Sequence, residues 1–351
     1  MRRRLSLEAI AGATGPLGPR ALRVKDVTGD GRPDLLVVLK ELERLLIIAQ
    51  AADGGFGAVE SLGTGSTPND VAAADLDGDG REELLVVGHF TDALRVWRGL
   101  DGGWGAPVDY PLGNHCQRLE LVDLDGDGRL DVVTQNGGSA GFFTVTFLLG
   151  RGDGSFGPAV ASTVGDTPAD LIVRSRGTDG HPEVLIATAN SAQLERRSFL
   201  RDAGLVRLPS FDLPARPLRV VFTNHRAGPG VFVATHGFES PAFVSVTTPS
   251  DGGLRLEDRL EVDDAFEAVV ADLSADGWAE LIVTSLAGEV RVFDGLPDGG
   301  AWRASRLLAD GGWPTSLVAD DLDGDGHLDL AWTSFDGQLE LAFGAHRCGR
   351  E

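Results

Sequence analysis

Cysteine, methionine and tyrosine are scarce in this chain of 351 residues, which has two cysteines, one methionine and one tyrosine. Two thiols are too few for a disulfide framework. We expect Cys116 and Cys348 to stay unpaired, because the repeat pattern described below places them on opposite faces. No apolar run is long enough to cross a membrane as a helix, and the amino terminus lacks the apolar segment of an intact signal peptide.

Positive charge is also in the minority. The chain has 31 lysines and arginines against 53 aspartates and glutamates, a net charge of -22. Such a polyanion repels nucleic acid and anionic membrane surfaces, so we expect neither a nucleic-acid partner nor membrane insertion. The acids are clustered along the chain, and this clustering favours a bound counter-cation.

One phrase recurs along the sequence: an apolar run, an Asp-Gly-rich loop, an acid and a second apolar run. Five clear copies begin at Asp26, Asp75, Asp123, Asp272 and Asp321. Neighbouring copies are about 49 residues apart, and the long interval between the third and fourth has room for two more. Eroded copies can be traced there, around Ser175 and Asn224. The chain therefore reads as seven repeats of about 49 residues.

A second phrase recurs half a period out of phase, as DGGFGAV from Asp53, DGGWGAPV from Asp101 and GDGSFGPAV from Gly152. Two turn signatures in each period indicate four short strands. In the second repeat the predicted strands are residues 70–75, 83–88, 93–99 and 107–112. A repeat of this length with four strands is typical of a β-propeller blade.

The predicted fold is therefore all-β, a seven-bladed β-propeller with four antiparallel strands per blade, in a single domain over residues 1–351. No helix is expected. The last repeat provides strands at 316–321, 329–334 and 338–344 but has no sequence left for an outer strand. Residues 4–9 can supply that strand, so we expect the N-terminal strand to join the C-terminal blade and close the ring.

The Asp-rich loops have the spacing of metal sites, with oxygen ligands at positions 1, 3, 5 and 9 and a carbonyl at position 7. Carboxylates this crowded repel one another unless a hard cation collects them, and ligands without Cys or His favour Ca²⁺. An EF-hand is excluded, since position 12 is never Glu and flanking helices are absent. Polar Asp-Gly turns without metal are the alternative, but such turns do not require the recurring acid at position 9.

We predict up to five structural calcium ions, with the site at Asp272 the weakest. In each loop the residue at position 7 binds through its backbone carbonyl and the others bind through their side chains. The predicted ligands are Asp26, Thr28, Asp30, Arg32 and Asp34; Asp75, Asp77, Asp79, Arg81 and Glu83; Asp123, Asp125, Asp127, Arg129 and Asp131; Asp272, Ser274, Asp276, Trp278 and Glu280; and Asp321, Asp323, Asp325, His327 and Asp329.

Taken together, the two phrases resemble the FG-GAP (VCBS) repeat family over essentially the whole chain. DLDGDGRLDVV at 123–133 and GRGDGSFGPAVASTVG at 150–165 show the likeness most clearly. The resemblance implies a propeller like the head domain of integrin α subunits, with calcium at the Asp positions above. It also implies a ligand or partner on the face opposite the calcium loops.

No catalytic constellation is found: HExxH, GxSxG and phosphate-loop motifs are absent, so an enzyme is not expected. We predict a calcium-binding scaffold for protein interaction or adhesion, located outside the cell, at the cell surface or in the periplasm. A lectin that binds glycans between blades or on the loop face is the alternative, and a polysaccharide-active enzyme is a weaker one. The candidate binding residues on the face opposite the calcium loops are His89, Phe90, Asn114, His115, Cys116, His236, Phe238, Trp313 and Phe335.

Overall fold

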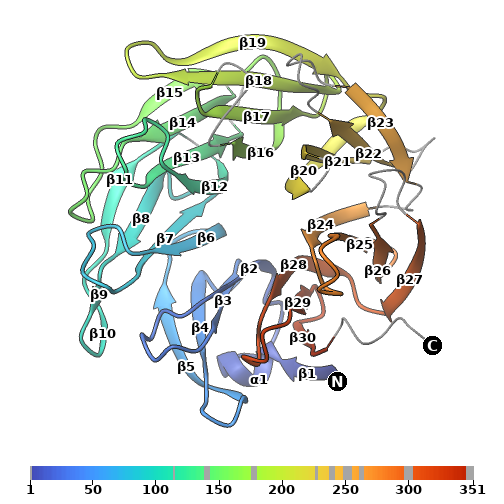
Figure 1. Ribbon diagram of the computed structural model, residues 1–351. Helices are drawn as coiled ribbons and strands as arrows, with labels where there is room; N and C mark the ends of the chain where they lie inside the picture. Colours follow the sequence, from blue (N-terminus) through green and yellow to red (C-terminus); the bar gives the residue numbers. More distant parts are fainter. Residues whose placement is uncertain are drawn as a thin grey trace.

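In a computed structural model the chain forms four-stranded antiparallel sheets arranged around a central axis (Figure 1). The structure describes residues 2–113, 115–137, 143–174, 180–225, 228–236, 242–247, 255–260, 265–295 and 303–344, with the backbone alone over 222–225, 228–236, 242–247, 255–260 and 303–305. Seven four-stranded sheets and one two-stranded sheet occur in these residues. The fold is all-β, as predicted, and has the arrangement of a β-propeller.

In six of the seven four-stranded sheets the strands follow chain order from the central axis to the outside. The first three sheets are β2 (Pro19–Lys25), β3 (Asp34–Leu39), β4 (Arg44–Gln50) and β5 (Phe56–Gly63); β6 (Pro68–Ala74), β7 (Glu83–Gly88), β8 (Ala93–Trp97) and β11 (Val108–Pro111); and β12 (Cys116–Val122), β13 (Asp131–Asn136), β14 (Thr144–Leu148) and β15 (Val160–Thr163).

The remaining sheets repeat the same order, and the last takes its outer strand from the amino terminus. They are β16 (Pro168–Arg174), β17 (Glu183–Thr188), β18 (Gln193–Leu200) and β19 (Gly204–Asp212); β20 (Arg216–His225), β21 (Gly228–His236), β22 (Ala242–Thr247) and β23 (Arg255–Leu260); β24 (Ala265–Ala271), β25 (Glu280–Ser285), β26 (Glu289–Asp294) and β27 (Arg303–Asp310); and β28 (Pro314–Asp320), β29 (Asp329–Ser334), β30 (Gln338–Ala342) and β1 (Arg2–Ser6).

The apolar core lies between neighbouring sheets. Every residue of β3, β7 and β13 is buried, because the next sheet covers each face of the second strand. Between the first two sheets, for example, Leu36 packs in one cluster with Val71 and Leu84. Each such side chain contributes about 1.5–3 kcal/mol by leaving water. The outer strand β5 is mostly exposed and has no regular alternation of buried and exposed residues. The packing between neighbouring sheets is therefore made mainly by their inner and middle strands.

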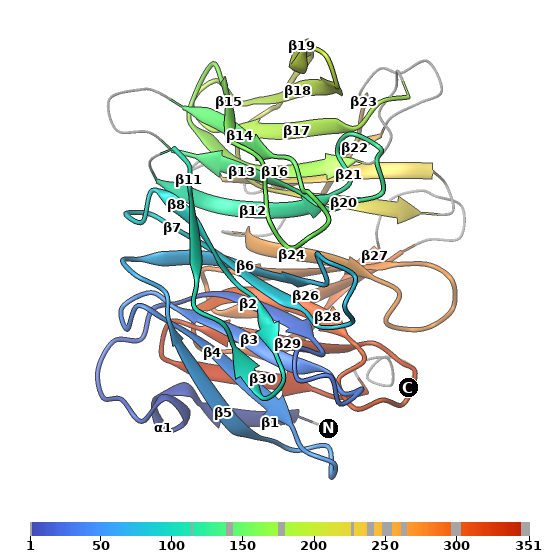
Figure 2. The same cartoon turned by 90° about the vertical axis from the view of Figure 1, so that its left-hand side faces the viewer.

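The inner strands contact one another in sequence around the axis. β2 lies against β6, β6 against β12, β12 against β16, β16 against β20, β20 against β24, β24 against β28, and β28 against β2. The same irregularity interrupts the pairing near the start of each inner strand, as between Pro168 and Asp170. Such a β-bulge bends the strand and re-aims its side chains. Figure 2 shows the inner strands from the side, where they lie one above another.

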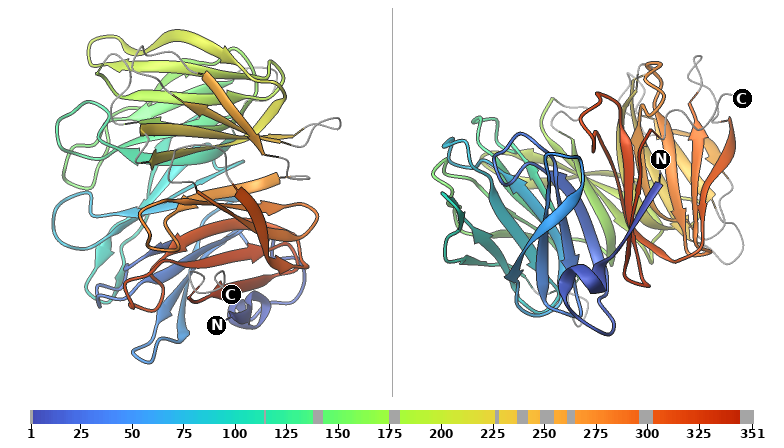
Figure 3. Two further views of the ribbon diagram at one scale, coloured as in Figure 1. Left: turned by 45° about the vertical axis from the view of Figure 1, so that its right-hand side comes forward. Right: turned by 90° about the horizontal axis from the view of Figure 1, so that it is seen from below.

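β1 is the fourth strand of the last sheet. It pairs antiparallel with β30 over five residues, from Arg2 opposite Ala342 to Ser6 opposite Gln338. Arg4 adds an ion pair of 3.1 Å with Glu340. Figure 3 shows the resulting proximity of the first and last strands of the sequence.

The expectation of a strand over residues 4–9 and of no helix was wrong in part. The strand ends at Ser6, and residues Leu7–Ala11 form a short helix, α1. The Ser6 side chain accepts the N–H of Ala9 and so caps the helix, and Gly12 ends it in the left-handed conformation. Leu7 is completely buried, which anchors the helix to the core. The described helix is too short to cross a membrane.

The second sheet also differs in detail from its predicted strands. The strand predicted over 93–99 ends at Trp97, and a small hairpin follows it, made of β9 (Gly99–Leu100) and β10 (Gly103–Trp104). The DGG turn lies within this hairpin, where Gly102 and Gly103 both have positive φ. The predicted strands 70–75, 83–88 and 107–112 correspond to β6, β7 and β11.

Candidate functional site

Five Asp-rich loops connect an inner strand to the second strand of the same sheet. Because every inner strand leads into its loop at its carboxyl end, the loops lie at the same end of their sheets. Each loop folds in the same way, so one description by position serves all five.

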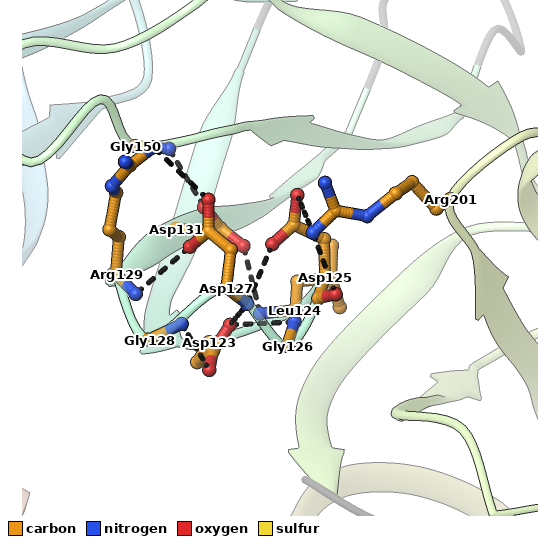
Figure 4. Close-up of polar contacts among 10 residues, drawn as sticks. All are labelled: Asp123, Leu124, Asp125, Gly126, Asp127, Gly128, Arg129, Asp131, Gly150 and Arg201. Carbon is orange, nitrogen blue, oxygen red and sulfur yellow. Dashed lines mark hydrogen bonds and ion pairs between the residues drawn. The ribbon is translucent and has the colours of Figure 1, made fainter.

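The carboxylate at position 1 closes the loop on its own backbone. In the third sheet Asp123 accepts the N–H of Gly126 at 2.8 Å and that of Gly128 at 3.0 Å (Figure 4). Both glycines have positive φ, 78° and 84°, which side chains disfavour. Asp75 and Asp321 make the same two bonds in their loops. The spacing of Asp and Gly in the sequence therefore reflects a specific turn.

Three loops bring three carboxylates together. One oxygen from each of three acids lies within 4.8 Å of the others, a separation at which one ion can contact all three. The groups are Asp75, Asp77 and Glu83; Asp123, Asp125 and Asp127; and Asp321, Asp323 and Asp325. These are the three loops that have an acid at each of positions 1, 3, 5 and 9. All three groups offer hard oxygen ligands, which suit Ca²⁺.

The acids at position 9 occupy a different setting from the others. Asp34, Glu83, Asp131, Glu280 and Asp329 are all buried, with at most 4% of their surface exposed. One oxygen of Asp131 accepts the N–H of Leu124 at 2.8 Å, and the other accepts that of Gly150 at 2.7 Å. The position-9 acid thus ties the loop to the end of the third strand. Of these five acids, only Glu83 lies in a three-carboxylate group.

Negative charge accumulates around these buried acids. Burial raises the pKa of Glu83, and the nearby Asp79 and Asp75 raise it further. Burial likewise raises the pKa of Asp329 to about 6, with Asp323 and Asp325 adding to the shift. A cation held by the loop carboxylates would oppose both effects, because opposite charge favours the ionised form. The loops therefore have more negative charge than their protein surroundings compensate.

Arginines neutralise part of this charge. The position-3 carboxylates of Asp77 and Asp125 are nearly buried, whereas that of Asp323 is exposed. Asp125 lies 3.1 Å from Arg201, which comes from the turn between β18 and β19 of the next sheet (Figure 4). Asp77 pairs with Arg98 of its own sheet. At position 7, the side chain of Arg129 turns back to Asp127 at 3.2 Å. Its carbonyl, the predicted ligand, is not used by that contact.

The loops at Asp26 and Asp272 have a hydroxyl at position 3, Thr28 and Ser274, and so one carboxylate fewer. In the Asp272 loop, position 4 is Ala275, which takes a φ of 53° where the other four loops have glycine. That conformation costs a side chain about 1–2 kcal/mol. The loop predicted as the weakest site thus combines fewer charges with backbone strain.

The fourth repeat replaces its missing carboxylates with an internal ion pair, which sequence reasoning did not find. Its position-9 acid, Glu183, is completely buried and pairs with Arg196 at 2.5 Å and with Arg174. The only sequence signal is Arg174 itself, at the end of an inner strand, directly before the eroded loop. Ser175 lies outside the described residues, as do the turn residues up to 179.

The opposite ends of the sheets present two aromatic clusters. His89, Phe90 and His115 form one, with ring centroids 4.0 Å apart for the two histidines and 4.6 Å for His89 and Phe90. Trp313 and Phe335 form the other, at 6.4 Å. Phe90 and Trp313 are each 61% exposed, unusual for large apolar side chains.

The other residues predicted for this face are not part of these clusters. Cys116 is a free, buried thiol whose Sγ lies 2.9 Å from Asn136 Oδ1, and burial raises its pKa to about 12. It is therefore a structural residue. Asn114, Phe238 and the side chain of His236 lie outside the described residues, as does Cys348.

The FG-GAP-like repeat family matches the chain three times, over residues 26–86, 75–134 and 272–332. Each match spans two successive Asp-rich loops and the strands between them. The chain thus contains three FG-GAP-like repeats, and the resemblance inferred from the sequence is confirmed over these residues. No curated protein matches the chain.

Solved structures share the fold at low sequence identity. A crystal structure of BBS1N in complex with ARL6DN, soaked with lead, is 16% identical with a TM-score of 0.67, and the match covers 100% of this chain and 98% of that one. The same complex soaked with mercury gives a TM-score of 0.66, with coverage of 97% and 94%. A protein from Lactobacillus plantarum is 16% identical with a TM-score of 0.61, covering 86% and 88%.

Proposed function

We propose that the chain is a calcium-stabilised, non-enzymatic β-propeller that serves as an interaction scaffold for a protein partner. The ring has seven blades and is closed by β1 in the last sheet. The contacts of β28 with β2 and the pairing of β1 with β30 support this closure. Closure also removes the exposed strand edges that would otherwise invite aggregation.

Calcium occupies the Asp-rich loops, up to five in all, with a structural role. The three groups of carboxylates support this proposal, as does the raised pKa of the buried acids beside them. Sites of this kind fill at the millimolar calcium found outside cells, so the protein acts outside the cell, at its surface or in the periplasm.

The partner binds the face opposite the calcium loops. The single observation behind this assignment is the pair of exposed aromatic clusters there, since aromatic side chains are enriched at the energetic centres of interfaces. BBS1N, a neighbour in fold, was crystallised in complex with ARL6DN, so a propeller of this shape can bind a protein.

Capture experiments test this function. The parent protein and the variants Phe90→Ser and Trp313→Ser are immobilised in calcium and exposed to secreted and cell-surface proteins. Exposed Phe and Trp can be replaced without opening a cavity, so the fold should survive. We expect specific proteins to bind the parent and to be lost from both variants. A control variant, Trp104→Ser on the loop side, should retain them. Equal capture by all four proteins would refute the assignment of the face.

Glycan binding is a second candidate, supported by a cavity of about 450 Å³ beside the first calcium loop. Trp104 lines it and donates a hydrogen bond to Glu60 at 3.1 Å, and Lys25 and Thr28 add polar groups. An aromatic ring with polar side chains suits a sugar. A glycan array separates the two functions: binding that is lost in Trp104→Ser and kept in Phe90→Ser favours the lectin.

A further inference from the structure

The central axis opens, on the face opposite the calcium loops, into a cavity of about 460 Å³. Each of the seven inner strands contributes at least one lining residue, always from the first few positions of the strand. His89 and Phe90 of the first aromatic cluster form part of the wall. The cavity is therefore a mouth of the central channel and is continuous with the surface proposed above for a protein partner.

The charge of this cavity is opposite to that of the molecule. Its lining contains Arg20, Lys40, Arg118 and Arg219 and no carboxylate, in a chain whose net charge is -22. Carboxylates do lie nearby: Asp170 is 3.3 Å from Arg118, Glu267 is 3.2 Å from Arg219, and Glu41 is 3.6 Å from Lys40. None of these carboxylates is among the residues that line the cavity, whereas the four cations are.

The cations in the wall have unused hydrogen-bonding capacity. In the described residues, the Nε atoms of Arg118 and Arg219 are buried and make no hydrogen bond, even though each is close to a carboxylate. The hydroxyl of Thr67 is buried there without a hydrogen-bond partner as well. Buried donors without acceptors are costly, and a bound acceptor would remove that cost.

The positive groups also crowd one another. Desolvation lowers the pKa of Arg20, Glu41 opposes that shift, and Arg219, from the fifth sheet, lowers the pKa further. Desolvation lowers the pKa of His89 too, with His115, Lys40 and Arg20 acting in the same direction. Like charges held together in this way favour an anion between them.

We propose that this cavity binds a carboxylate side chain from an acidic segment of the protein partner. The proposal rests on the scaffold function above and names the chemistry that the partner must present. Arg20 and Lys40 draw the carboxylate in, the guanidinium groups of Arg118 and Arg219 donate to it, and Phe90 and Phe266 contact the apolar part of the segment. Charge complementarity of this kind gives specificity and a faster encounter.

Fluorescence anisotropy with a short labelled peptide tests the proposal. The peptide contains two adjacent glutamates, and a matched peptide with glutamines in their place serves as the ligand control. We expect the glutamate peptide to bind the calcium-loaded parent, and the double variant Arg20→Gln/Lys40→Gln to weaken binding about tenfold or more. Arg151→Gln, on the loop side, is the matched protein control and should bind as the parent does. The same binding of both peptides, or unchanged binding by the double variant, would overturn the proposal.

Binding of inorganic phosphate to the same protein is measured as the second part of the experiment. A site that prefers phosphate and ignores the glutamate peptide would be a small-anion site, and the proposal would be wrong. The capture experiment separates this proposal from the scaffold function. If the double variant retains a partner that Phe90→Ser loses, the result supports the scaffold function and refutes the carboxylate site. Loss of that partner from the double variant, with Arg151→Gln unaffected, supports the site.

Discussion

One carboxylate oxygen of Asp170 accepts the backbone N–H of Val220 at 2.9 Å and so joins the inner strand of the fourth sheet to that of the fifth. The same position supplies the same bond elsewhere: Asp70 accepts the N–H of Leu119, and Ser316 that of Leu22. Each bond follows the β-bulge that every inner strand contains. The sheets are therefore joined by specific polar contacts around the axis as well as by apolar packing.

Replacement of Asp170 by alanine should destabilise the protein strongly. The side chain is completely buried and also lies 3.3 Å from Arg118, which would lose the nearer of its two ion-pair partners, the other being Glu120. Breaking a buried pair in this way costs about 3–5 kcal/mol. Asp109→Ala is the control: Asp109, on the outer strand β11, forms an exposed pair of 2.7 Å with Arg95 of β8, worth about 1 kcal/mol or less. Urea unfolding measures both, and equal losses would contradict a structural role for the inner contacts.

Glu120 predicts a pH dependence of stability. Burial raises its pKa to about 7, although Arg118 and Arg23 lower it. Its unfolded pKa is lower, so folding disfavours the ionised form, and this residue's contribution to stability falls as pH rises from about 4.5 to 7. Glu120→Gln removes that titration. The melting temperature of the variant should rise relative to the parent between pH 5 and pH 8; a constant difference would be evidence against the raised pKa of Glu120.

The ion pair of the fourth repeat should make its stability independent of calcium. Glu183→Ala leaves Arg174 and Arg196 buried without their carboxylate and should cost about 3–5 kcal/mol. The cost should be the same in calcium and in chelator. Asp131→Ala is the equivalent change in an Asp-rich loop. Its loss of stability should be larger in calcium than in chelator, because the change also weakens calcium binding by that loop. Urea unfolding in calcium and in chelator gives the comparison. If the loss of stability in Glu183→Ala depended on calcium, the arginines would not be taking the place of an ion in the fourth repeat.

Ala275→Gly should improve the loop at Asp272. It removes a side chain from a backbone held at a φ of 53°, where the equivalent residue of the other loops is glycine. We expect unfolding to require about 1 kcal/mol more, with tighter calcium binding at this loop. Gly126→Ala, the reverse change in the third loop, should have the opposite effect. Calorimetric unfolding of both variants checks the pair, and a loss of stability in Ala275→Gly would show that strain is not what weakens this loop.

The repeat spacing was sufficient to predict the sheets because each period encodes two turns and a fully apolar second strand. β29, for example, has the predicted bounds of 329–334. The failures have local causes. Residues 7–11 form a helix because Ser6 caps it and Leu7 finds a buried site, and neither contact is visible as a period in the sequence.

The loops were predicted from the spacing of their acids, but the different roles of the acids within each loop were not. Sequence treats the position-9 acid as one ligand among several, whereas its burial and its bonds to Leu124 and Gly150 depend on the third strand. The pairs of Glu183 with its arginines and the positive channel mouth depend on side chains from different strands. Such juxtapositions follow from the arrangement of the sheets around the central axis, and no local pattern indicates them.

Calcium binding by the loops is the central claim, and the number of ions bound per chain tests it most directly. Chelator-treated protein is titrated with calcium in an isothermal calorimeter, beside the variant Asp125→Asn. We predict at least three ions for the parent, one for each group of carboxylates, and one fewer for the variant. Absence of binding at millimolar calcium, or the same number of ions in both proteins, would contradict the account.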